Sequence, residues 1–282
     1  MSLSVLNNIS AIYAQNNLTS TQSSLQKTLQ QLSSGSRINS GADDAAGLAL
    51  ADGLAANEAA LAQSAKNASN ATGYLQTADG ALSQVTSLLN RAVTLATETA
   101  NGTLSASQIS SADQEYQNIL NEIDNIGTTT NFNGINVFSN TAVNFVVSDG
   151  TTSGTSTFAV TVGTLAQATV GTSSAGAGET LAGTALAGGA ADATLLNTLT
   201  SAIQDVAYQR GTIGASINQL SAAQGVASTE QTNLTAAEDG VRATDYGTAA
   251  SNLSKYQVLS QTGISALAQA NSVQQEVLKL LQ

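Results

Sequence analysis

Two pairs of adjacent carboxylates, Asp43-Asp44 and Glu238-Asp239, are the side chains with the clearest potential for acid–base chemistry. A general acid and a general base must face the same substrate, but adjacent residues on a helix point about 100° apart. Both pairs also lie near expected helix starts, where the helix dipole stabilises negative charge. The pairs therefore indicate helix ends and not a catalytic dyad.

Residue types that supply much of enzyme chemistry are absent, because the 282 residues include no Cys, no His and no Trp, and there is also no Pro. Without Cys and His the chain has no disulfide, no thiol nucleophile, no zinc site of the usual kind and no Ser-His-Asp relay. A chain of this length would carry about fourteen prolines at average usage, so their absence favours long uninterrupted helices. We expect no enzyme, no cofactor and no metal site.

The charge pattern narrows the set of partners. Charged residues make up 10% of the chain, with 8 Lys and Arg against 19 Asp and Glu, for a net charge of −11. No Lys or Arg lies between Arg91 and Arg210, and a phosphate backbone is held mainly by clustered positive charge. No run approaches the roughly 18 apolar residues of a membrane span. Residues 1–8 lack the pattern of a cleaved secretory signal. We expect no nucleic acid partner, no membrane span and no cleaved signal peptide.

Hydrophobic periodicity predicts long helices. Apolar residues at helical spacing from Ser4 to Leu32 predict a first helix, with Gly35 as its C-cap. Ser40 or Asp43 is expected to cap a second, much longer helix. Apolar residues recur every seven positions in that helix and again near the other end of the chain, which is typical of a coiled-coil seam. The two series are Leu54, Leu61, Ala68, Leu75, Leu82, Leu89 and Ala96, and Leu199, Val206, Ile213, Leu220, Ala227, Leu234 and Val241.

The two series have equal length, so two long helices are predicted to lie side by side over about 65 Å. Between them, apolar residues from Ile109 to Ile126 repeat with spacings of three and four and predict a shorter helix. Asn101-Gly102 is expected to form the turn before this helix, and Gly127 is expected to end it.

Residues 128–194 have a different composition, because Thr, Gly and Val replace the leucine pattern. Residues 144–147 and 156–162 predict two strands of a hairpin about Ser148-Asp149-Gly150. Residues 171–194 contain few large side chains and are expected to be a loop or loosely packed. Helical periodicity resumes after Gly240.

The predicted fold class is mainly α with a small β insert. Long antiparallel helices form a coiled-coil-like bundle, a β-hairpin region lies in the middle of the chain, and the terminal helices pair. This pattern fits a generic helical bundle with a β decoration. It also fits a self-assembling rod in which apolar stripes on the terminal helices are faces for neighbouring copies.

Residues 29–50 have the sequence LQQLSSGSRINSGADDAAGLAL, which closely resembles the N-terminal signature of bacterial flagellins. The resemblance extends over roughly residues 1–140 and 195–282. Further matching strings lie at 121–124, 131–134, 243–246, 252–255, 267–271 and 277–281.

The resemblance implies a division into domains. Residues 1–40 and 241–282 would be the N-terminal and C-terminal helices of an inner core domain that lines the filament channel. Residues 41–127 would supply the N-terminal helices of a second domain, 128–194 its β-hairpin and loop insert, and 195–240 its C-terminal long helix. Because the unmatched middle is short, the chain resembles a flagellin with little or no outer variable domain.

The resemblance also implies a function and partners. The chain would be a structural subunit that self-assembles into the helical, hollow bacterial flagellar filament used for swimming motility. It would be extracellular and exported without a cleaved signal peptide. Its implied partners are other copies of itself in a homopolymer, the filament cap, junction proteins, an export chaperone that masks the C-terminal helix, and the flagellar export apparatus.

A further implied partner is the flagellin-sensing Toll-like receptor. Arg91, Leu95 and Glu115 stand where the family's receptor contacts stand, and Thr94 replaces the usual acidic residue. Two alternatives to a filament subunit stay open from the sequence. One is a hook-filament junction protein of the same family. The other is a secreted adhesin whose 128–194 insert binds a ligand, which the insert's lack of Trp, Arg and Lys disfavours.

Overall fold

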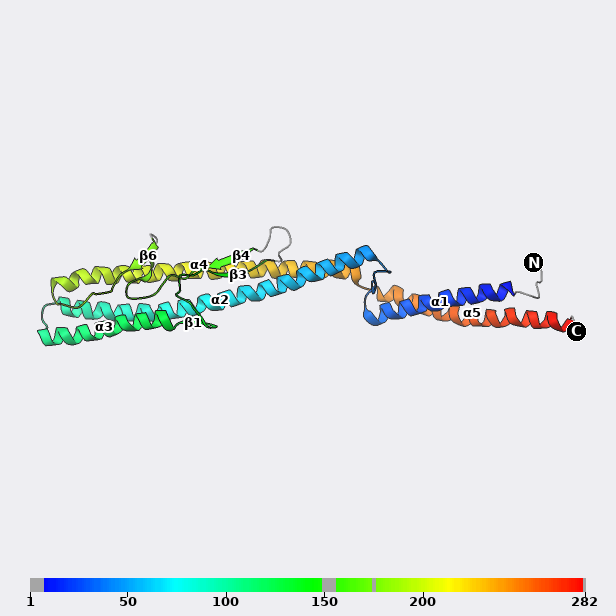
Figure 1. Cartoon of the computed structure of the whole chain (residues 1–282), viewed down its shortest axis with the longest axis horizontal. Helices are drawn as coiled ribbons and strands as arrows, with labels where there is room; N and C mark the ends of the chain where they lie inside the picture. Colours follow the sequence, from blue (N-terminus) through cyan, green and yellow to red (C-terminus); the bar gives the residue numbers. More distant parts are fainter. Residues whose placement is uncertain (1–7, 149–155, 174–175, 281–282) are drawn as a thin grey trace. The chain divides into compact units, whose positions relative to one another are not determined.

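The computed structural model describes residues 8–148, 156–173 and 176–280 and confirms the predicted fold class (Figure 1). The chain divides into two compact units. Unit 1 comprises Met1–Ala56 and Asn233–Gln282, and unit 2 comprises Asn57–Thr232. The helices in chain order are α1 (Ile9–Ser34), α2 (Ala45–Ala100), α3 (Ala106–Thr129), α4 (Ala190–Arg242) and α5 (Tyr246–Leu280).

The first helix ends as the sequence predicts. Gly35 has a left-handed φ of 70°, and its N–H donates to the Gln31 carbonyl at 3.0 Å. This conformation costs glycine little, because glycine has no Cβ to clash. The helix begins at Ile9, and its cap is Asn8, whose side chain accepts a hydrogen bond from the Ala11 amide at 3.0 Å. The predicted helical residues 4–7 lie outside the described residues.

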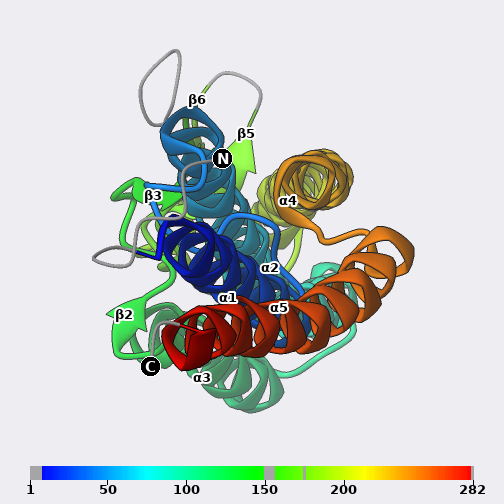
Figure 2. The same ribbon diagram turned by 90° about the vertical axis from the view of Figure 1, so that its right-hand side faces the viewer.

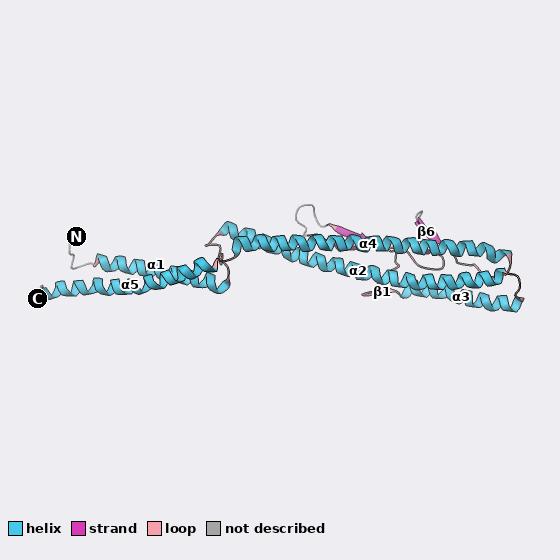
Figure 3. Cartoon of the chain, turned by 180° about the vertical axis from the view of Figure 1, so that it is seen from behind, coloured by secondary structure: helices cyan, strands magenta, loops and turns pink. Residues whose placement is uncertain are grey.

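Among the described residues between α3 and α4 there are three short antiparallel hairpins (Figure 3). The predicted pair of strands is confirmed as β3 (Val143–Val146) and β4 (Thr157–Val160), with Phe145 opposite Phe158. Most of the turn between them lies outside the described residues. The others are β1 (Asn131–Phe132) with β2 (Ile135–Asn136), and β5 (Val170–Ser173) with β6 (Gly176–Glu179).

The expectation of a loop or loosely packed segment at 171–194 is wrong in part. Residues of this stretch form most of the β5–β6 hairpin and the start of α4, and Leu181 and Leu186 are buried. Leucine periodicity does not detect such a segment, because polar contacts hold it in place. Three helical carboxylates accept hydrogen bonds from its backbone amides. These are Asp205 from Glu179 at 3.0 Å, Asp113 from Leu186 at 2.8 Å, and Asp192 from Ala187 and Gly188, both at 2.8 Å.

Gly127 does not end α3, contrary to prediction, because the helix continues to Thr129. The glycine is buried, and a Cβ at this position would lie 1.8 Å from the carbonyl oxygen of Leu165. Its role is therefore to let the insert backbone approach the helix. On the same side of α3, Asp124 accepts a hydrogen bond from the Gln167 amide at 2.6 Å.

Unit 2 has one hydrophobic core, to which α2, α3, α4 and the insert all contribute. Most members of the two heptad series belong to it, but Leu54, Leu234 and Val241 are half-buried and belong to unit 1. The predicted seam residues that are buried in unit 2 are Leu61, Leu75, Leu82, Leu89, Leu199, Val206, Ile213 and Leu220.

We predict that Leu82→Asp destabilises unit 2 severely. Leu82 is fully buried, so the substitution leaves a cavity and places an unpaired charge in the core. We expect a loss of roughly 4 kcal/mol in the free energy of unfolding. Urea denaturation of the monomer measures it. The exposed position two residues along serves as the control, because Gln84→Asp should change stability by less than about 1 kcal/mol. Equal melting of wild type and L82D would show that the seam is misplaced.

Replacing a buried side-chain amide in the same core is predicted to increase stability. Gln209 is 2% exposed, and its side-chain nitrogen and oxygen have no hydrogen-bond partner among the described residues. Burying such groups without partners costs free energy, so Gln209→Met should raise the free energy of unfolding by about 1 kcal/mol. Gln204→Met, at an exposed position of the same helix, is the control. A destabilised Q209M protein would mean that the amide is paired in solution.

Candidate functional site

The terminal helices α1 and α5 pack against each other in unit 1 (Figures 1 and 2). Their contacts fix an antiparallel arrangement. Near the start of α1, the Asn8 side chain donates to the Ala270 carbonyl at 2.9 Å. Leu18 lies close to Gly263, and just after the end of α1, Gly35 lies close to Tyr246. Contacts therefore move toward the start of α5 as the chain moves along α1.

This terminal helix pair has very little core. The buried residues described in unit 1 are only Thr28, Ile38, Ala51 and Ala249. By contrast, ten of the thirteen large hydrophobic side chains that are exposed in the described chain belong to unit 1, and they are between 43% and 68% exposed. They are Ile9, Ile12, Tyr13, Leu29, Leu50, Tyr246, Val258, Leu259, Ile264 and Val273.

Covering the exposed apolar side chains of unit 1 would favour association with another protein surface. Covering the exposed half of one such side chain stabilises by about 1 kcal/mol, at ~25 cal/mol per Å². Association of two proteins costs roughly 4–15 kcal/mol in lost freedom of motion. A contact must therefore cover several of these side chains together, and the ten that unit 1 exposes could contribute about 10 kcal/mol, which is within the range of that cost.

A polar junction joins the two chain segments that connect the helices of unit 1. The backbone after α1 and the backbone after α4 form an antiparallel bridge at Ser36 and Ala243. Its hydrogen bonds run from the Arg37 amide to the Arg242 carbonyl at 2.7 Å and from the Thr244 amide to the Gly35 carbonyl at 3.0 Å. The Arg37 guanidinium also donates to the Val241 carbonyl. The bridge thus ties the N-terminal and C-terminal parts of unit 1 together.

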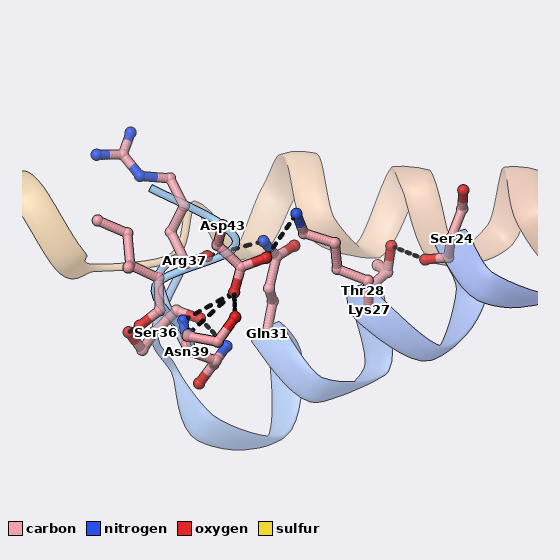
Figure 4. A network of polar contacts seen from close by, with 10 residues as sticks. Ser24, Lys27, Thr28, Gln31, Ser36, Arg37, Asn39 and Asp43 are labelled. Atoms are coloured by element: carbon pink, nitrogen blue, oxygen red, sulfur yellow. Dashed lines mark hydrogen bonds and ion pairs between the residues drawn. The ribbon is translucent and has the colours of Figure 1, made fainter. Parts of the chain in front are cut away.

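Asp43 organises the connector between α1 and α2 (Figure 4). Its carboxylate lies 2.7 Å from Lys27 Nζ and accepts hydrogen bonds from the amides of Asn39 at 3.2 Å and Ser40 at 3.0 Å. The Lys27 contact, followed by the Ser40 and Asn39 hydrogen bonds, lowers the pKa of Asp43 to about 2. The cap of α2 is Asp44, which accepts from the Gly47 amide at 2.9 Å. The prediction that Ser40 or Asp43 caps α2 is therefore wrong, because Asp43 binds within the connector and the next residue, Asp44, is the cap.

The second carboxylate pair does not lie at a helix start. Glu238 and Asp239 belong to the end of α4, which continues past Gly240 to Arg242. Negative charge is unfavourable there, and Arg242 offsets it with Nη1 3.3 Å from Glu238 Oε1. The pair was expected near a helix start because helical periodicity resumes after Gly240, but α4 runs without a break to Arg242. Neither carboxylate pair forms a catalytic arrangement, and the described residues contain no group of three or more ligating side chains that could hold a metal ion.

Comparison with known proteins identifies the family. The family model for the bacterial flagellin N-terminal helical region matches residues 5–143, and the model for the C-terminal helical region matches residues 196–281. The flagellar filament 33 kDa core protein of Treponema phagedenis is 33% identical, over 97% of this chain and 98% of that protein. The flagellin of Xenorhabdus nematophila is 34% identical, with 99% of each chain covered. The chain belongs to the bacterial flagellin family.

A solved structure is also similar to this flagellin-family chain. The crystal structure of Bacillus cereus flagellin is 30% identical in sequence, and its comparison covers 61% of this chain and 94% of that chain with a TM-score of 0.47. None of the helices described here is long and apolar enough to cross a membrane.

The residues that flagellin resemblance marks as receptor contacts have different environments. Arg91 and Glu115 are exposed and form a two-pronged ion pair between α2 and α3, with distances of 2.6 Å and 3.0 Å. These hydrogen bonds lower the pKa of Glu115 and raise that of Arg91, because they favour both charged forms. Leu95 is 3% exposed and belongs to the core of unit 2. Only the ion pair is therefore accessible in the folded chain.

The sequence of this flagellin-family chain does not show which single apolar residues of unit 1 stay exposed. The exposed apolar side chains of α1 and α5 have no sharp heptad spacing, so their helical periodicity predicts an amphipathic helix without saying which positions stay uncovered. The contact of Lys27 with Asp43 could not be predicted from the sequence either. A lysine sixteen residues before an aspartate carries no pairing signal, and the connector brings the two together only when it folds.

We predict that Lys27 sets the acidity of Asp43. The folded pKa of about 2 lies below the ordinary value of 3.8. The carboxylate contacts therefore stabilise the connector above about pH 4, and this contribution is lost as the pH falls toward 2. A carbon-13 titration of the Asp43 carboxyl group should give a midpoint near 2, and Lys27→Met should raise it toward 3.8. Lys255→Met should leave it unchanged. A wild-type midpoint near 3.8 would contradict the described contact.

Proposed function

We propose that this chain is a structural subunit that polymerises with its own copies into a helical, hollow bacterial flagellar filament, outside the cell, for swimming motility. Both relatives described above have names of filament proteins. No observation favours the hook-filament junction alternative or a ligand-binding adhesin. As a member of a family of structural proteins, the chain is proposed to have no enzymatic role.

The observation that carries this proposal is the contrast between a terminal helix pair with almost no core and ten exposed large hydrophobic side chains in the same unit. A two-helix pair with so little burial is marginal in water, because most helical stability in proteins comes from tertiary packing. Neighbouring copies supply the missing packing. We therefore propose residues 1–40 and 241–282 as the inner core domain of the filament, with residues 41–240 as the next shell.

The symmetry of the assembly follows from the kind of contact. When the patch on one copy binds a different patch on the next, the contact either closes into a ring or continues as an open helix. A filament requires the second case. Contacts repeated along the whole length of two helices give each subunit several neighbours, which makes such a polymer stiff.

The remaining partners are proposed on family membership alone. They are the filament cap, junction proteins, the export apparatus, and an export chaperone on α5. A chain without Cys or Pro suits transport in an unfolded state and refolding outside, because neither disulfide formation nor proline isomerisation slows it. For the flagellin-sensing Toll-like receptor, the proposed contact is the exposed Arg91–Glu115 pair.

We predict that deleting residues 1–30 abolishes polymerisation and leaves unit 2 folded. The deletion removes most of α1, and with it the packing of α5, but no residue of unit 2. The wild-type monomer should form long filaments of uniform width by negative-stain electron microscopy after addition of filament seeds or a precipitating salt. The truncated protein should stay in the supernatant after ultracentrifugation. Circular dichroism should show that the helices of unit 2 remain.

Point variants test whether assembly needs the exposed apolar side chains of α1 or only the presence of the helix. Ile12→Ser with Tyr13→Ser should raise the monomer concentration needed for assembly by roughly tenfold or more, since two exposed apolar side chains are lost. Asn16→Ser with Asn17→Ser is the matched polar control on the same helix. Normal filaments from the truncated protein, or equal assembly of the two double variants, would refute the proposed role of α1.

A further inference from the structure

The chain contains two Asn-Gly pairs, and both lie in turns of unit 2. Asn101-Gly102 follows α2 and precedes α3, and Asn133-Gly134 lies between β1 and β2. An asparagine that precedes glycine is chemically vulnerable, because glycine has no side chain to keep its amide nitrogen away from the asparagine side chain. The two pairs have the same sequence but different surroundings, so the fold gives them different freedom to react.

The Asn101-Gly102 pair is held loosely. Both residues are exposed, and the Asn101 side chain makes no hydrogen bond among the described residues. The Gly102 amide donates to the Thr99 carbonyl at 3.5 Å, which is longer than the usual limit of about 3.2 Å. The same carbonyl accepts a shorter hydrogen bond of 3.2 Å from the Gly189 amide. The Gly102 nitrogen is therefore the weaker of two donors that share one acceptor.

Movement of this turn meets little resistance. The pair follows directly after Ala100, the last residue of α2, and helix ends fray. A Cβ built on Gly102 would have no atom within 4 Å apart from its own chain neighbours. The turn can therefore open locally while the core of unit 2 stays packed.

The Asn133-Gly134 pair is fixed by its hairpin. Both residues have a left-handed φ, of 51° and 80°, as in the two-residue type I′ turn that closes many hairpins. The strands on either side pair directly, with Phe132 opposite Ile135. The Gly134 nitrogen reaches the Asn133 side chain only after the Asn133 backbone rotates out of this turn. The hairpin must therefore open before this pair can react.

We propose that Asn101 is a site of spontaneous deamidation and that the fold protects Asn133 from the same reaction. The Gly102 nitrogen attacks the side-chain carbonyl carbon of Asn101 and closes a five-membered succinimide ring. The bond from that carbon to the side-chain nitrogen breaks, and this nitrogen leaves as ammonia with the proton of the Gly102 amide. Water then adds to either carbonyl of the ring, which opens to aspartate or isoaspartate. The reaction consumes only water and does not depend on the proposed filament function.

Deamidation changes both the charge and the backbone at the end of α2. A carboxylate replaces a neutral amide just after the C-terminus of the helix, where negative charge is unfavourable and where Glu98 is already near. Isoaspartate also adds one carbon atom to the backbone between Ala100 and Gly102. The Thr99 carbonyl bonds to Gly189, just before α4, so the change occurs where the end of α2 meets the start of α4. This end of unit 2 is therefore loosened as the protein ages.

Peptide mapping by mass spectrometry measures both sites in one sample of full-length monomer. Cleavage after glutamate releases residues 99–115, which contain Asn101, and cleavage after phenylalanine releases residues 133–138, which begin with Asn133. The chain is aged at neutral pH, either folded or unfolded in guanidinium chloride, and the unfolded chain gives the intrinsic rate of each site. In the folded chain we expect Asn101 to react within about threefold of its intrinsic rate and Asn133 to be slowed at least roughly tenfold.

A variant tests the chemical route. Gly102→Ala should slow the reaction at Asn101 at least roughly tenfold and leave Asn133 unchanged, because a Cβ hinders the attacking nitrogen. Circular dichroism shows whether this variant stays folded. In the wild-type chain both aspartate and isoaspartate should form at Asn101, since the ring opens on either side. Equal slowing of both asparagines by folding, or a faster reaction at Asn133, would overturn the proposal, and so would aspartate without isoaspartate.

Discussion

Burial of the leucine-rich series on α2 and α4 is the interaction on which the rest of unit 2 depends. Leu75, Leu82 and Leu89 are at most 1% exposed, as are Leu199, Val206 and Leu220. Because these positions recur every seven residues, they fix which side of each long helix faces inward. The inward-facing sides of α2 and α4 determine how the other elements of unit 2 pack. The side of α3 that carries Asp113 and Asp124 meets the insert, and the opposite side of α4 is left toward solvent.

Unit 1 is built on a different physical principle. It has long helices but almost no buried large side chains, and its internal order rests on backbone hydrogen bonds between connectors and on the Asp43 contacts with Lys27, Asn39 and Ser40. Polar contacts of this kind give direction and register but little net stability. A single chain can thus contain one part that is complete alone and one part that is completed by its neighbours.

The sequence predicted the fold class, the order of the helices and the β3–β4 hairpin, because these depend on repeated local signals such as heptads and alternating strand residues. The sequence-based predictions were wrong where the role of a residue depends on a contact with a residue far away in the chain. Gly127 was predicted to end α3 because glycine is common at helix ends. In the structure, its lack of a side chain lets the Leu165 backbone pack closely against the helix. Glu238 and Asp239 are carboxylates of the kind found at helix starts, but they lie in the last turns of α4, which ends at Arg242. The exposed apolar positions were unpredictable for the same reason, since exposure depends on what packs nearby.

The carboxylates that hold the insert have a consequence for how this protein can change over time. Asp124, Asp205, Asp113 and Asp192 accept hydrogen bonds from backbone amides of the insert. A backbone amide is the same chemical group in every residue except proline. These hydrogen bonds therefore specify the path of the segment whatever side chain the donor residue carries. Substitutions other than proline can accumulate at Glu179 or Ala187 with the path unchanged, whereas Gln167 also donates from its side chain to Asp124 at 2.6 Å.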